Sequence, residues 1–175
     1  MVMTSLSKGL IEDIMAYYEK MNHYDFVVKP SLPILFFGDI ESFVNQNKRI
    51  VTVALNPSDK EFRSSHDENY SYFRFPQYKK SGETLIKSLN NYFKSRPYNG
   101  WFKSSFETFL NGLTCSYYPD NPYDKVLHTD IGSPLATNPT WGKLSQYQKS
   151  LLIKDGFEFW KRLMVEIKPQ LIILW

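Results

Sequence analysis

The sequence has little cysteine and no long hydrophobic run. Cys115 is the one cysteine among 175 residues, which excludes an internal disulfide and favours a reducing compartment. No stretch approaches the roughly 18 apolar residues of a membrane span, and the N-terminus MVMTSLSKGL is not typical of a secretory signal. These absences predict a soluble, cytoplasmic protein that makes no membrane contact.

Motifs for metal sites and for phosphate-binding loops are also lacking. The three histidines, His23, His66 and His128, are far apart, and no Cys/His pair has the spacing of metal ligands. Neither a glycine-rich phosphate loop nor a GxSxG elbow is present, which argues against nucleotide hydrolysis and acyl transfer. The sequence therefore predicts no metal site.

Aromatic residues are abundant, and the charge is nearly balanced. Phe, Tyr and Trp make up 17% of the chain, and the formal net charge is +3. Such a weakly basic balance permits nucleic-acid binding without indicating it, because the usual mark is a strongly basic domain with a clustered patch. The length is that of a single domain, residues 1–175, with a core that needs no disulfides.

Apolar patterns predict helices that alternate with short strands. Unbroken apolar strands between helices are typical of a parallel sheet covered on both faces, so we expect an α/β fold with three layers, α/β/α, around a short, mostly parallel sheet. The expected helices cover about 6–22, 85–93, 102–113 and 151–167, and the expected strands are 50–55, 125–129 and 171–175.

Ligands of such sheets bind at the carboxyl ends of the strands, which here lead to Asn56 and Asp130. Asn56 and Pro57 are ordinary turn residues and need no functional explanation. At a ligand-binding edge, however, an amide can hold a water that it cannot deprotonate, which suits attack on a very electrophilic centre such as an oxocarbenium ion. Asp130 either braces its loop or hydrogen-bonds a ligand.

An aromatic cluster follows Asn56 in a long polar loop and contains Tyr70, Tyr72, Phe73 and Phe75. Aromatic residues in a loop usually anchor it to the core. They are also what a protein needs to stack a planar base, at about 1–3 kcal/mol per base.

Together these segments resemble the uracil-DNA glycosylase superfamily over about 34–175. The likeness rests on VTVALNPS, VLHTDIGSPLATNPTWGKLS and GFEFWKRLMVEIKPQLIILW, in that order and spacing. The branch with Asn in its first motif, which includes the mismatch-specific and single-strand-selective enzymes, has G-[MI]-N-P-G at this turn. Asn56 and Pro57 match it, whereas Ala54 and Ser58 replace the two glycines.

The resemblance implies a DNA partner and hydrolysis of the N-glycosidic bond of a flipped uracil-type or modified base, without metal or cofactor. It implies that Asn56 positions the water that attacks the sugar C1′, and that the turn holds the base through Leu55, Pro57 and Ser58. Phe75, or alternatively Phe73, would stack on the base.

Asp130 aligns with an Asn that hydrogen-bonds uracil in several members of the superfamily. An ionised Asp only accepts hydrogen bonds, so it would favour a base edge rich in donors, such as the cytosine amino group. The family's second motif, a histidine turn, follows a further strand, and the chain ends before it. We therefore expect a C-terminally truncated domain whose last strand, PQLIILW, is central and buried on both faces, and which oligomerises through that edge or covers it with 34–37.

Two other functions remain open from the sequence. The first is a catalytically inactive module on the same fold that binds nucleic acid or a nucleotide, which Asp130 and the missing second motif favour. The second is a generic Rossmann-like binder of small molecules, which predicts no DNA affinity. The target base and the preference for single or double strands are not determined by the sequence.

Overall fold

The computed structural model describes residues 6–64 and 67–175, and it confirms the α/β class. The helical elements are α1 (Lys8–Met21), α2 (Ile40–Val44), the 3-10 helix η1 (Asp59–Phe62), α3 (Gly82–Asn90), η2 (Tyr92–Lys94), α4 (Asn99–Trp101), the π-helix η3 (Phe102–Glu107), α5 (Thr108–Gly112), η4 (Trp141–Lys143) and α6 (Gln146–Ile167). The strands are β1 (Ile50–Ala54), β2 (Cys115–Ser116), β3 (Asp124–Lys125), β4 (Leu127–Asp130) and β5 (Leu171–Leu174).

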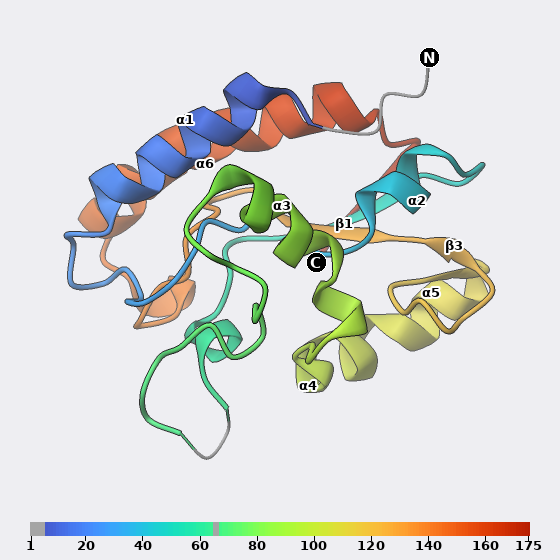
Figure 1. Cartoon of the computed structure of the whole chain (residues 1–175), viewed down its shortest axis with the longest axis horizontal. Helices are drawn as coiled ribbons and strands as arrows, with labels where there is room; N and C mark the ends of the chain where they lie inside the picture. Colours follow the sequence, from blue (N-terminus) through green and yellow to red (C-terminus); the bar gives the residue numbers. More distant parts are fainter. Residues whose placement is uncertain (1–5, 65–66) are drawn as a thin grey trace.

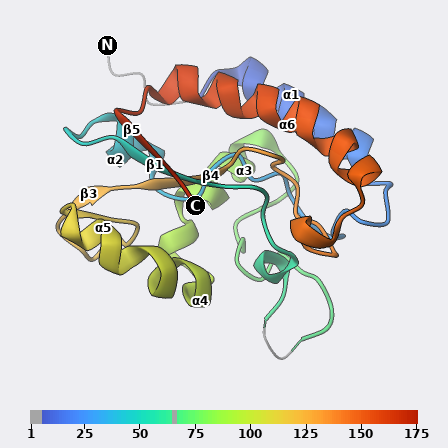
Figure 2. The ribbon, with the colours of Figure 1, turned by 180° about the vertical axis from the view of Figure 1, so that it is seen from behind.

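A parallel sheet of three strands, in the order β4-β1-β5, lies at the centre of the fold (Figure 2). Val51 of β1 pairs with Leu127 of β4 and with Ile172 of β5. The first four residues of β1 are buried, because an apolar, β-branched strand between two neighbours has both faces covered. β2 and β3 form a separate parallel pair.

Helices lie on both faces of this sheet, as predicted. α1 and α6 run side by side on one face, and α4 and α5 lie on the other (Figures 1 and 2). Polar contacts join the two long helices: the Ser7 backbone N–H donates to Glu166 Oε2 at 2.7 Å, and Arg162 Nη1 lies 2.8 Å from Asp13 Oδ2.

α6, the longest helix, has clear start and stop signals. Ser145 and Gln148 form a capping box at its N-terminus. At its C-terminus Lys168 adopts a left-handed conformation with φ of 48°, directly before Pro169, which cannot continue the helix. Among the described residues, no helix has both the length and the apolar character needed to cross a membrane.

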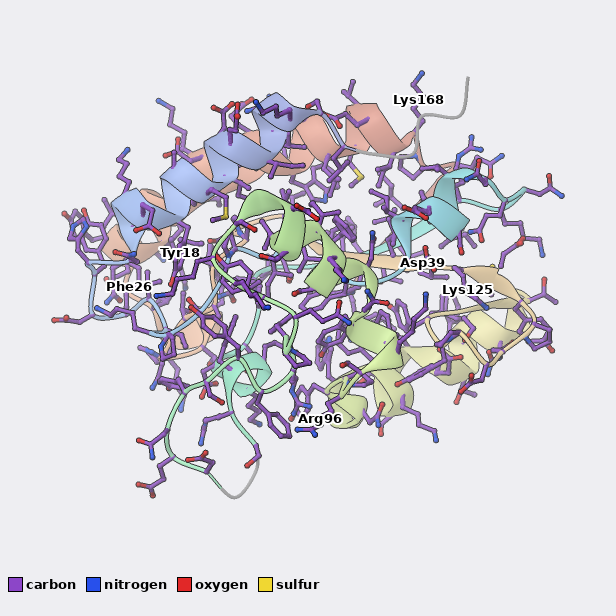
Figure 3. All side chains as sticks on the ribbon, viewed as in Figure 1. Tyr18, Phe26, Asp39, Arg96, Lys125 and Lys168 are labelled. Carbon is purple, nitrogen blue, oxygen red and sulfur yellow. The ribbon has the colours of Figure 1, made fainter. Side chains whose placement is uncertain are left out.

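The face opposite α1 and α6 is packed with aromatic rings, and Figure 3 shows how densely side chains fill the space around the sheet. Phe93 stacks on Tyr117 with ring centroids 4.8 Å apart and meets Phe102 edge-on at 4.9 Å. Phe37 lies 4.6 Å from Tyr92. Offset and edge-on ring pairs of this kind add to the stability that burial provides.

The last strand does not have the predicted central position. Among the described residues β5 pairs with β1 alone, so it lies at the edge of the sheet, and most of its residues are exposed. The buried segment 34–37 covers the opposite edge: Phe37 donates its N–H to the His128 carbonyl at 2.8 Å and accepts in return at 3.0 Å. A segment committed to β4 in this way cannot cover β5.

Candidate functional site

A cavity of about 380 Å³ lies at the carboxyl ends of β1 and β4. This is the edge of a parallel sheet at which ligands usually bind. The loops that follow the two strands are joined by backbone hydrogen bonds. The Leu55 carbonyl accepts from the N–H groups of Gly132 at 2.8 Å and Ser133 at 3.1 Å. The polar residues of the wall are Asn56, Ser58, Lys60, Glu61, His128, Asp130 and Thr140.

Asn56 is held by the loop after β4. Its Nδ2 donates to Thr137 Oγ1 at 2.9 Å and to the Leu135 carbonyl at 3.3 Å. These two acceptors fix which end of the amide is the nitrogen, and no hydrogen bond of the described residues uses Oδ1. Because Asn56 lines the cavity, its amide oxygen is the group left to orient a molecule inside.

The other turn residues predicted from the sequence line the same cavity. Leu55 is half exposed, and Pro57 is buried. Ser58 caps η1, and its hydroxyl accepts from the Lys60 N–H at 3.2 Å. The turn after β1 therefore forms a continuous part of the wall on both sides of Asn56.

Asp130 also lines the cavity, at the end of β4, and it is buried. Its Oδ2 is enclosed and has no hydrogen-bond partner in the described part of the chain. Burial, and then the negative charge of Glu61, raise the pKa of the Asp130 carboxyl well above its ordinary value of 3.8.

Glu61 is a second buried carboxyl in the wall, and no pattern in the sequence singles it out. Burial raises its pKa to about 7, although a hydrogen bond from the Tyr92 hydroxyl and the Arg74 guanidinium, 3.8 Å away, act in the opposite direction. In the sequence, DKEF looks like an ordinary charged turn. In the fold, Glu61 accepts a hydrogen bond from Tyr92, a residue from a distant segment.

His128 contributes a neutral imidazole to the wall. Burial lowers its pKa to about 3. Its Nδ1 lies 2.8 Å from the Thr52 hydroxyl, which in turn lies 2.6 Å from the Tyr117 hydroxyl. This chain of hydrogen bonds satisfies polar groups that are buried beneath the cavity.

Phe75 and Phe73 do not line the cavity, which corrects the prediction that one of them stacks on a base. Phe75 is completely buried against Phe62 and Tyr92, because a turn directs it into the core, with its N–H donating to the Tyr72 carbonyl at 2.9 Å. The aromatic loop thus serves as an anchor.

Phe73 lies close to two guanidinium groups. The Cζ atoms of Arg74 and Arg96 are 5.4 Å and 5.1 Å from the centre of its ring. The aromatic wall is formed instead by residues from distant parts of the chain: Phe37, Tyr98, Trp101, Phe102, Trp141 and Trp175.

A second, basic hollow adjoins the cavity and shares Lys60 and Tyr98 with it. Arg63 and Arg74 complete its charged wall. Arg74 is held in place, since its Nε donates to the Lys60 carbonyl at 3.1 Å and its Nη1 to the Arg96 carbonyl at 2.6 Å; Arg96 is labelled near α4 in Figure 3. Asp59 pairs with Arg63 at 2.9 Å and offsets part of this charge.

Within residues 6–64 and 67–175, no three His, Cys, Asp or Glu side chains gather in a way that could hold a metal ion. His66, one of the three histidines weighed above, lies outside the described residues.

The resemblance to uracil-DNA glycosylases is one of short sequence motifs. Comparisons with protein-family models, with curated protein sequences and with solved structures each return no match. The chemistry of the cavity is therefore the basis for assigning a function.

Proposed function

We propose that this protein hydrolyses the N-glycosidic bond of a nucleobase bound in the cavity, with Asn56 positioning the attacking water. The observation that carries the proposal is the fixed amide of Asn56. Its nitrogen is occupied by Thr137 and Leu135, the residue lines the cavity, and no hydrogen bond of the described residues uses its oxygen. A preoriented acceptor of this kind can hold one water in a single geometry.

The size and the walls of the cavity suit a planar base. Its volume of about 380 Å³ lies within the range of small-molecule sites. Aromatic side chains such as Tyr98, Trp101 and Trp141 form much of its wall, and aromatic faces favour stacking with heterocycles. A base inside a duplex would have to leave the stack to enter such a cavity.

Glu61 is suited to take the proton of the water. In the proposed reaction the water oxygen bonds to C1′, and the C1′–N bond breaks with its electron pair going to the base. The proton of the water passes to Glu61, and the departing base later takes up a proton. A carboxyl with a pKa of about 7 is matched to this role, because a general base works best when its pKa is near the operating pH.

The basic hollow next to the cavity supports a nucleic acid as the substrate. Lys60, Arg63 and Arg74 could contact phosphates on either side of a flipped nucleotide. Such contacts fix the position of the strand without selecting its sequence, which leaves the choice of base to the cavity.

The test uses single-stranded and double-stranded oligonucleotides that carry uracil, hypoxanthine or only ordinary bases. We expect alkali-labile sites at a modified base, and Asn56→Ala should lower the single-turnover rate by about 10²-fold or more while DNA affinity changes little. Asn45→Ala is the matched control, since Asn45 is an exposed amide that bonds the Glu41 carbonyl in α2, away from the cavity.

Two results would contradict the proposal. Equal losses of binding and rate in Asn56→Ala would make Asn56 a structural residue. Tight binding of base-modified DNA without cleavage would favour the alternative, a catalytically inactive nucleic-acid or nucleotide-binding module.

A further inference from the structure

Asp130 combines burial with the lack of a partner among the described residues. Only 6% of its surface is exposed, and in this part of the chain nothing forms a hydrogen bond with the enclosed Oδ2. No ion pair of the described residues includes it. This is unusual, because a buried charge is ordinarily paired or hydrogen-bonded.

Three titratable groups near Asp130 are anionic or neutral, so they cannot stabilise a negative charge on its carboxyl. Glu61 is a carboxyl in the same cavity, and its charge opposes ionisation of Asp130. His128 is neutral, because burial lowers its pKa to about 3. Tyr117 is also neutral, since burial raises its pKa.

The nearby cations are directed elsewhere. Lys60 is exposed, and its Nζ lies 5.6 Å from the centre of the Tyr98 ring. Arg74 lies 3.8 Å from Glu61, so its charge favours ionisation of Glu61. The geometry thus divides the roles of the two carboxyls: Glu61 has partners for its negative charge, and Asp130 has none within residues 6–64 and 67–175.

A carboxyl without such partners keeps its proton, and the proton changes what it can bind. An ionised carboxylate only accepts hydrogen bonds, whereas a carboxylic acid donates one through its O–H. The sequence-based expectation that Asp130 favours amino groups assumed the ionised form. The neutral form therefore offers a donor, which the ionised form lacks, and can pair with a carbonyl oxygen.

We propose that Asp130 acts as a neutral carboxylic acid, which donates its O–H to a carbonyl oxygen of the ligand and releases that ligand when it ionises. The inference rests on the proposed function, because it names the chemical class of ligand for the same cavity. Uracil and hypoxanthine carry such a carbonyl. Cytosine and adenine carry an amino group there, to which the O–H cannot donate.

The protonation state can be measured directly on the whole protein. We expect the carboxyl carbon resonance of Asp130, assigned with Asp130→Asn, to be that of the acid at neutral pH. Glu61→Gln should lower the midpoint of its titration, because it removes the repelling charge. A midpoint near the ordinary 3.8 would overturn the inference.

Binding of free uracil and free cytosine, measured by calorimetry between about pH 6 and about pH 8.5, tests the ligand class. We expect uracil to bind about tenfold more tightly or better, and Asp130→Asn to keep this preference while binding varies less with pH. Asp130→Leu should lose the preference. Asp124→Asn on β3, outside the cavity wall, is the control.

The inference would be overturned if the wild type preferred cytosine and Asp130→Asn preferred uracil. An ionised carboxylate, which only accepts hydrogen bonds, would behave in this way. If Asp130→Leu does not fold, the carboxyl carbon resonance of Asp130 and the binding measurements on Asp130→Asn still test the inference. Free bases have no glycosidic bond, so these measurements stand even if the protein hydrolyses nothing. Conversely, hydrolysis by a protein whose Asp130 is ionised would leave the proposed function intact.

Discussion

Glu61 is buried beneath the turn after β1, and this position makes the stability of the fold depend on pH. Its pKa is raised from 4.5 in the unfolded chain to about 7 in the folded protein. The folded state therefore holds the proton more tightly. The stabilisation of the folded state by the protonated Glu61 is fully present below about pH 4.5 and is lost as the pH rises through 7.

We expect Glu61→Gln to remove this dependence. As the pH rises from below 4.5 to above 7, the free energy of unfolding of the wild type should fall by about 3 kcal/mol relative to that of the variant. The reason is that glutamine cannot ionise. Denaturant unfolding at several pH values measures it. Glu12→Gln, at an exposed position on α1, is the control and should follow the wild type. Superimposed pH profiles for Glu61→Gln and wild type would contradict the prediction.

At the scale of single residues, the sequence located Asn56 and Asp130 correctly at the cavity, because both directly follow strands whose apolar pattern is unambiguous. It missed Glu61, which is buried and bonded to Tyr92, a residue 31 positions away in the sequence. It also misplaced the aromatic wall. Position along the loop suggested Phe75, but ring direction is set by a local turn that the residue types do not reveal.

At the scale of elements, α6 fixes the loop after β4 through one close approach. A Cβ on Gly156 would lie 2.3 Å from the Gly132 carbonyl oxygen and 2.8 Å from Ser133 Cα. These are backbone atoms of the loop that bonds Leu55, so they cannot move without shifting the turn that carries Asn56. Only glycine permits the helix to lie this close.

We expect Gly156→Ala to lower the free energy of unfolding by about 1–3 kcal/mol, because overpacking costs more than the gain in helix propensity. It should also weaken ligand binding in the cavity. Thermal or denaturant unfolding measures the first effect, and calorimetry the second. Gly9→Ala is the matched control: a Cβ there meets nothing within 4 Å on α1, so it should leave stability unchanged or slightly raised. Equal behaviour of the two variants would contradict this role of Gly156.

α6 and β1 were predictable for reasons that are visible in the chain, whereas α2 and the short strand β2 were not predicted. Ser145 caps α6, Pro169 follows its end, and the strand of residues 50–54 is apolar and β-branched. The place of β5 was not predictable in the same way. An unbroken apolar run indicates burial on both faces, but which neighbours a strand has is decided by the fold as a whole.

At the scale of the whole molecule, the open edge of β5 is the most exposed apolar surface of the sheet. Leu174 is 71% exposed and Trp175 is 59% exposed. An unpaired edge strand with apolar side chains is a template for pairing with another chain. We therefore expect the 175-residue protein to self-associate as its concentration rises.

Leu174→Lys should weaken this association by about tenfold or more, since a charge at an edge opposes strand pairing. Sedimentation velocity over a range of concentrations measures it. Val165→Lys is the control, because Val165 is also 71% exposed but lies on α6. If both variants associate alike, the edge of β5 is not the contact.

The tryptophans give the cavity an optical property. Of the four in the chain, Trp101, Trp141 and Trp175 line it, whereas Trp160 donates its indole N–H to Thr129 at 3.1 Å and lies outside its wall. Indole emission responds to the polarity of its surroundings and to stacked rings. We therefore expect the ultraviolet fluorescence of the protein to report directly on what occupies the cavity, while Trp160 provides a constant background.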